Sequence, residues 1–212
     1  MAKNIYHDSL VRVLQSVMKN ADIAEETARA LIDRYRTLED IVTAPIPELA
    51  TIAGKNAATL LKLAGCVASR RETDAFRFGE VCTRSEIVRY FRAHFIGKHV
   101  ETLCIMTFDA DGRAIAMHEV SEGTVNASGV LPRKLLECAL ADGAASLALA
   151  HNHPHGVAVA SHEDRAMTAS ITEVLRLTGI EMRFHVLIAG HYYEIISPLE
   201  DVNAISRLQN RI

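Results

Sequence analysis

Tryptophan is absent from this chain of 212 residues, and aromatic residues make up only 5% of it. Proteins that bind single-stranded nucleic acids stack the bases on aromatic side chains, so a surface of that kind is not expected. An excess of positive charge is missing as well, because 26 acidic residues outnumber 23 basic ones and give a net charge of −3. Binding to nucleic acid would therefore depend on a local basic patch.

Long apolar runs are also missing. No stretch approaches the roughly 18 apolar residues that a membrane-spanning helix needs, and the first residues lack the apolar core of a secretory signal. The few cysteines are widely spaced and form no Cys-x-x-Cys pair: Cys66, Cys82, Cys104 and Cys138. Reduced, mostly buried thiols in a cytoplasmic protein are expected, with a disulfide or a cysteine-zinc site as the alternative.

Residues 1–80 have a helical pattern and no strand pattern. Apolar residues recur at helical spacing over 8–36, and Gly54 then separates two short helices. This hairpin resembles a helix-hairpin-helix element, in which backbone amides of a turn with two glycines hold a DNA phosphate. Ile52 stands where the first glycine would be, and a β-branched residue does not readily adopt a positive φ. We expect a helical packing or protein-contact domain, with DNA binding near Lys55 as the alternative.

Residues 81–212 have the pattern of a mixed β-sheet flanked by helices. Expected helices follow Thr83 and Pro132, and a third runs from the 151–164 stretch to Thr178. Runs typical of strands lie between and after these helices, at 101–108, 114–120, 145–150, 184–189 and 192–196. The first two strands form a hairpin, and the strand, helix, strand order that follows predicts a crossover to an adjoining strand. The expected fold is therefore α/β, with a domain boundary near residue 80.

Three potential metal ligands, His151, His153 and Asp164, lie in one stretch that begins where an apolar run ends. In an extended chain residues i and i+2 project to the same face, so both imidazoles can approach one ion. Asp164 begins the apolar stripe of the following helix and therefore points toward the core on the same side. Two imidazoles and one carboxylate suit Zn²⁺, and the fourth position is left for water, as in catalytic zinc sites.

A simpler interpretation of this stretch needs no metal. Ser161 and Asp164 fit a helix capping box in which Ser161 is the N-cap. His155 and His162 are expected to be loop or exposed helix residues rather than ligands. The hydroxyl of Ser161 could also donate a hydrogen bond to an oxyanion that develops in a reaction.

A general base is expected from outside this stretch. Along 114–120 we expect Ile115, Met117 and Glu119 to share one strand face, so that a carboxylate ends a row of apolar side chains. Such a carboxylate needs a partner or a role, and a metal-activated water needs a base. Glu119 is therefore the candidate base, unless the strand leaves the core there and its side chain lies in water. Glu122 is the competing carboxylate.

The spacing from His151 to Asp164 matches the JAMM motif of the JAB/MPN metallohydrolases, H-x-H-x7-S-x2-D. The surrounding His-Asn-His-Pro-x-Gly, and Gly123-Thr-Val before Pro132-Arg133, resemble the RadC-like (UPF0758) branch. The resemblance implies a mixed sheet of the cytidine-deaminase-like kind, zinc on the two histidines and the aspartate, Glu119 as general acid/base and Ser161 as oxyanion support. It implies a zinc-dependent hydrolase of peptide or isopeptide bonds with a peptide or protein substrate.

This chain departs from the branch at three places. His155 stands where serine is usual, the loop 156–160 is apolar rather than polar, and Phe184 replaces an aspartate that could support the site. The segment between Glu119 and Gly123 also looks one residue shorter. The alternative function is a non-catalytic DNA-repair-associated or protein-interaction module with a structural or idle metal site. A zinc deaminase is disfavoured because Pro-Cys-x-x-Cys is missing, and the sequence leaves homodimer formation open.

Overall fold

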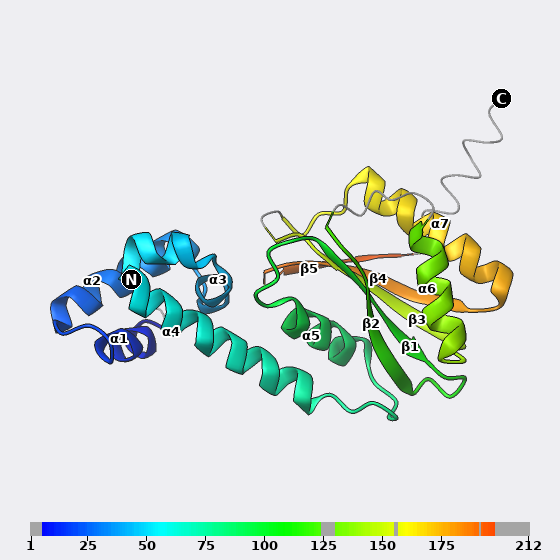
Figure 1. The fold of residues 1–212 in the computed structure, drawn as a ribbon, viewed down its shortest axis with the longest axis horizontal. Coiled ribbons are helices and arrows are strands. Elements are labelled where there is room, and N and C mark those ends of the chain that lie inside the picture. The colour runs from blue at the N-terminus through cyan, green and yellow to red at the C-terminus, as the bar shows by residue number, and fades with distance from the viewer. Residues whose placement is uncertain (1–5, 124–129, 155–156, 191, 198–212) are drawn as a thin grey trace. The chain divides into compact units, whose positions relative to one another are not determined.

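The computed structural model describes residues 6–123, 130–154, 157–190 and 192–197. The chain divides into two compact units, residues 1–73 and 74–212 (Figure 1). The boundary expected from the sequence, near residue 80, lies just beyond the end of the longest helix. None of the helices in the described ranges is long and apolar enough to cross a membrane.

The N-terminal unit consists of helices wherever the structure describes it, as the sequence predicted. They are α1 (His7–Gln15), α2 (Ala21–Tyr35), α3 (Leu38–Thr43) and α4 (Ile46–Ala75). The helical run expected over 8–36 is therefore two helices, and Asn20 begins the second by accepting hydrogen bonds from the backbone amides of Asp22 and Ile23. Their buried faces form one core, which includes Leu10, Leu14, Leu31, Ile41, Leu49 and Leu61.

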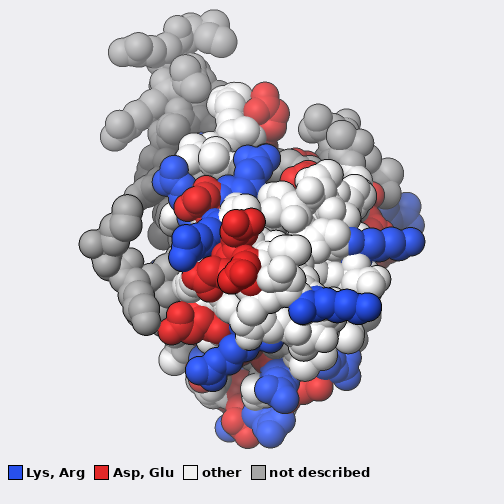
Figure 2. Space-filling view, turned by 90° about the vertical axis from the view of Figure 1, so that its left-hand side faces the viewer, with Lys and Arg blue, Asp and Glu red and all other residues white. Residues whose placement is uncertain are grey.

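Helix α4 is broken at Gly54, where φ is 75° and ψ is 161°. This backbone conformation is essentially reserved for glycine, and it lies where the sequence predicted the turn of a helical hairpin. Ile52, just before the break, is partly buried against the core of the unit. Figure 2 looks onto this unit, and on the face drawn the basic side chains are interspersed with acidic ones. DNA binding through residues 1–80 stays a prediction.

A mixed sheet forms the centre of the second unit, with the strand order β2-β1-β3-β4-β5. The strands are β1 (Thr102–Phe108), β2 (Ala114–Glu122), β3 (Ser146–Asn152), β4 (Glu181–Ala189) and β5 (Tyr192–Ile196), and the helices are α5 (Arg84–Phe95), α6 (Val130–Ala141) and α7 (His162–Thr178). Among the strand pairs in the described ranges, only β3–β4 is parallel. The predicted α/β fold class is confirmed. One detail differs, since β3 adjoins β1 rather than β2, so the connection through α6 crosses over β1.

The helices bury opposite faces of this sheet. The face that we call the α5 face packs against α5 through Cys104, Met106, Ala148, Ala150 and Phe184. The face that we call the α7 face packs against α6 and α7 through Leu103, Ile105, Leu147 and Leu149. Successive strand residues point to opposite faces, so these two sets alternate along each strand.

A bulge in β2 changes which of its side chains share a face. The pairing with β1 leaves Ile115 as an extra residue between Ala114 and Ala116. The expectation that Ile115, Met117 and Glu119 form one row was therefore wrong at its first member. The buried Ala114 takes that place and packs with Met117 on the α5 face, because one extra residue reverses the alternation.

The cysteines form no disulfide, as expected. The expectation that they are mostly buried was wrong, because only Cys104 is buried and Cys66 is exposed on α4. Burial, with a contribution from the nearby Glu119 carboxylate, raises the pKa of the Cys104 thiol to about 12. This thiol is therefore protonated and unreactive at neutral pH.

Replacing Gly65 by alanine should destabilise the contact between α3 and α4. A β carbon at this position would lie 2.9 Å from the Cβ of Val42 and 3.1 Å from its carbonyl oxygen. We expect urea unfolding to show a loss of about 1–3 kcal/mol, as for other overpacked sites. The loss should shrink in a Val42→Gly background, which removes the Cβ and Cγ2 atoms that the new β carbon would meet, and strict additivity of the two substitutions would contradict the proposed clash.

Candidate metal centre

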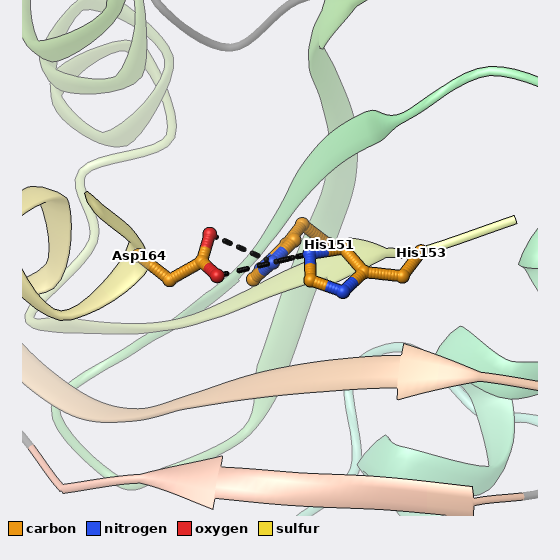
Figure 3. A group of neighbouring side chains, drawn as sticks. All are labelled: His151, His153 and Asp164. Carbon is orange, nitrogen blue, oxygen red and sulfur yellow. Dashed lines mark hydrogen bonds and ion pairs between the residues drawn. The ribbon is translucent and has the colours of Figure 1, made fainter. Parts of the chain in front are cut away.

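His151, His153 and Asp164 meet at one end of the sheet. His151 lies in β3, and His153 directly follows this strand. The backbone N–H of His153 donates to the carbonyl of Ile188 at 2.8 Å, which continues the parallel ladder with β4. Asp164 lies in the first turn of α7, and its carboxylate faces both imidazoles (Figure 3). The structure thus brings together the three residues that the sequence singled out as ligands.

Asn152, between the two histidines, fixes the end of β3. Its side chain is buried, accepts a hydrogen bond from the backbone N–H of Thr102 at 2.8 Å and donates one to the carbonyl of Val100 at 3.2 Å. These bonds tie the histidine pair to the start of β1. Sequence reasoning assigned no role to Asn152, although a polar residue at the end of an apolar strand was a visible signal.

The ligand atoms have the spacing that a small cation requires. Nε2 of His151 lies 3.1 Å from Oδ1 of Asp164 and 3.2 Å from Nε2 of His153. Nε2 of His153 lies 3.7 Å from Oδ2 of Asp164. Ligands about 2.0–2.1 Å from a tetrahedrally coordinated zinc ion are about 3.3 Å apart. The separations from Nε2 of His151 are close to this value, and Asp164 approaches His153 through its other oxygen at a somewhat longer distance, so this group can hold a metal ion.

Asp164 is held in place by the capping box that the sequence predicted. Oδ2 of Asp164 accepts hydrogen bonds from the hydroxyl of Ser161 at 2.7 Å and from its backbone N–H at 2.8 Å. Burial acts to raise the pKa of the Asp164 carboxyl, but the hydrogen bonds from His151 and Ser161 outweigh it and hold this pKa well below the usual range. The capping box and the ligand role are therefore compatible, since Asp164 stays ionised and points toward the histidines.

Two buried residues that sequence reasoning missed stand behind His151. Nδ1 of His151 lies 2.7 Å from Nε2 of His185 in β4. Nδ1 of His185 lies 2.6 Å from the hydroxyl of Thr168 in α7. Burial, and then the neighbouring His151, lower the pKa of His185 well below its ordinary value, so that this ring is neutral. A lone histidine in an otherwise apolar strand, and a threonine one helical turn after Asp164, were the signals in the sequence.

Glu119 lies apart from these residues. It is opposite Cys104 in the β1–β2 pairing, so its side chain leaves on the α5 face, whereas His151 is opposite Leu103 on the α7 face. Its carboxylate accepts from Nζ of Lys98 and contacts Nε2 of His94, each at 2.8 Å. The hydrogen bond from Lys98 is the main cause that lowers the pKa of Glu119, partly opposed by burial and reinforced by His94.

A sequence model of the RadC-like JAB domain matches residues 81–198. The chain is 33% identical over 174 residues to a UPF0758 protein of Chromobacterium violaceum, covering 81% of this chain and 78% of that protein. It is 30% identical over 183 residues to a UPF0758 protein of Methylibium petroleiphilum, covering 85% and 82% of the two chains. The chain belongs to the RadC-like JAB domain family. The resemblance carried by the histidine and aspartate motif is thereby confirmed.

Two residues that differ from or flank the usual RadC-like pattern, Phe184 and His162, lie in described parts of the structure. The side chain of Phe184 lies on the α5 face, with the guanidinium of Arg84 5.4 Å from its ring centre. An aspartate at this position would point away from His151, so these contacts give it no role in supporting the metal site. His155 lies outside the described residues, and His162 is exposed at the start of α7.

The apolar loop of this RadC-like domain borders the metal centre. Nδ1 of His153 lies 3.3 Å from the carbonyl of Val157. The side chains of Val157 and Val159 are 69% and 63% exposed. The far end of the loop is fixed by Glu194 of β5, which accepts from the backbone N–H of Ala160 at 2.6 Å. Two exposed valines are therefore presented beside the ligand His153.

Purified protein should contain about one divalent metal ion per chain, as measured by inductively coupled plasma mass spectrometry. His153→Ala and Asp164→Ala should each remove most of it, because two of the three ligands cannot hold the ion alone. His162→Ala is the matched control and should keep the metal, since this histidine is exposed outside the ligand group. Metal content unchanged in Asp164→Ala would contradict the assigned site.

Proposed function

We propose that this RadC-like protein is a zinc-dependent hydrolase of peptide or isopeptide bonds. The observation that supports the proposal most directly is that two imidazole nitrogens and one carboxylate lie within 4.8 Å of one another. Magnesium and calcium prefer oxygen ligands, whereas this donor set suits zinc. Three protein ligands with an open fourth position are typical of catalytic zinc sites. A zinc ion there would polarise the scissile carbonyl and supply an activated water.

The protein residues have separate roles in this proposal. His151 and His153 present Nε2 to the ion, and Asp164 supplies a carboxylate that stays ionised. Ser161 holds Asp164 through its hydroxyl. Support of an oxyanion by Ser161 would require this hydroxyl to leave the capping box, so we assign it first as a positioning residue.

The proposed substrate is a peptide or protein whose apolar side chains contact Val157 and Val159 beside the centre. Both valines are exposed, and their loop is anchored by Glu194. Burial of two valines by a substrate would contribute about 1–3 kcal/mol each to binding. The peptide bond to be cleaved would then lie near the ligand His153, which contacts the same loop.

The position of Glu119 favours a second candidate function, a metal-binding interaction module, including a DNA-repair-associated one, without hydrolysis. A general base must come within hydrogen-bond reach of the water that it deprotonates. Glu119 is instead paired with Lys98 and His94 on the α5 face, and its lowered pKa makes it a weaker base. Hydrolysis with Glu119 as the general base would require its carboxylate to leave Lys98 and His94.

Substitution of Glu119 separates the two functions. Zinc-loaded protein is incubated with a library of proteome-derived peptides, and new N-termini are counted by mass spectrometry. Wild-type protein should generate new termini, and Glu119→Gln should retain zinc but lose about 10²-fold or more of the rate, as on removal of a general base. Glu122→Gln is the matched control on the same strand and should remain active.

The opposite pattern, with Glu122→Gln inactive and Glu119→Gln active, would show that the wrong carboxylate was chosen. Zinc-loaded wild-type protein that yields no more new termini than Asp164→Ala would contradict the peptidase proposal. In that case the interaction module would be the better explanation.

A further inference from the structure

A chain of buried polar contacts begins at His151 and ends at the residue that supplies the third ligand. Nδ1 of His151 contacts Nε2 of His185 at 2.7 Å, and Nδ1 of His185 contacts the Thr168 hydroxyl at 2.6 Å. The same hydroxyl donates to the backbone carbonyl of Asp164 at 2.7 Å. His151, His185 and Thr168 are each at most 1% exposed, so water cannot replace a missing partner.

The hydrogen bond between Thr168 and the backbone carbonyl of Asp164 fixes the direction of the other two. A carbonyl oxygen can only accept, so Thr168 uses its single proton on Asp164. Its oxygen must then accept from Nδ1–H of His185. A second proton would leave a charge on a ring that is completely buried, so Nε2 of His185 is an acceptor. His151 therefore carries a proton on Nδ1 and donates it to His185. The nitrogen that His151 presents to His153 and Asp164 is then Nε2, and a metal ion there takes the place of the Nε2 proton that Asp164 accepts in its absence.

We infer that Thr168 and His185 are positioning residues of the metal centre, which hold His151 in the one neutral tautomer that can bind a metal ion through Nε2. In the reverse direction Thr168 would donate to His185, and His185 would donate to Nδ1 of His151. His151 would then carry its proton on Nε2, where the ion belongs. The inference rests on metal binding at the proposed centre and does not depend on hydrolysis.

His153 is also held with its proton on Nδ1, but without a series of buried side-chain contacts. Its Nδ1 faces the backbone carbonyl of Val157 at 3.3 Å, an acceptor that again requires a proton on Nδ1. Both histidine ligands are thus oriented by bonds that end on carbonyl oxygens. The difference is that His151 lies inside the sheet, so two side chains from β4 and α7 must carry the constraint.

Thr168→Val tests the inference, because valine keeps the shape of the side chain and removes the hydroxyl. The Nδ1–H of His185 would then lose its acceptor, so the His185 tautomer with its proton on Nε2 would be favoured. That proton would be donated to Nδ1 of His151, which would force His151 into the wrong tautomer. We expect zinc affinity, measured by competition with a chromophoric chelator, to fall by about 10- to 100-fold, as for other residues that orient a metal-bound histidine. Thr168→Ser should restore it.

Thr172→Val is the matched control. The Thr172 hydroxyl makes the same kind of bond one helical turn further on, to the carbonyl of Thr168 at 2.7 Å, whereas the contact with Nδ1 of His185 is made by Thr168. Thr172→Val should bind zinc like wild-type protein. Equal zinc affinity in wild-type protein and folded Thr168→Val, or equal losses in Thr168→Val and Thr172→Val, would overturn the inference.

A second readout needs no metal. Nitrogen chemical shifts of ¹⁵N-labelled imidazoles in metal-free protein should show His185 protonated on Nδ1 in wild-type protein and on Nε2 in Thr168→Val. Wild-type His185 protonated on Nε2 would overturn the inference. Wild-type protein that binds no zinc would overturn the proposed function, while these shifts would still decide the tautomer.

Discussion

Two imidazole nitrogens and a carboxylate lie within 4.8 Å of one another at the end of the sheet. The side chains of His151 and Asp164 are only 1% and 14% exposed, so water screens their charges and lone pairs poorly. Groups of this kind are stable together only when a proton or a cation lies between them. The surrounding structure supplies the constraint that keeps them together: Asn152 pins the strand end, and Ser161 holds Asp164.

The two faces of the sheet divide the polar residues of the domain into separate groups. The ligands, His185 and Thr168 lie between β3, β4 and α7, while Glu119 lies with Lys98 and His94 on the α5 face. The ion pairs of Glu119 show that this candidate base and the candidate metal centre are held independently. Any coupling between them depends on a change of partners by Glu119.

The candidate metal ligands could be predicted from the sequence because their relation is local. A strand places His151 and His153 on one face through its period of two residues, and a helix directs Asp164 inward through its apolar stripe. Both elements formed as the apolar patterns predicted. The row containing Ile115 was wrong because a bulge depends on pairing with another strand, and no periodicity within β2 reveals it.

The sequence by itself determined the α/β class, the group of candidate metal ligands and the capping box, since each follows from residues close together along the chain. The tertiary structure alone decided which face of the sheet Glu119 occupies, and that His185 and Thr168 stand behind His151. These relations join β2 to α5, and β3 to β4 and α7. Contacts between distant segments depend on strand order, bulges and helix packing, which arise only when the whole chain buries its apolar surface.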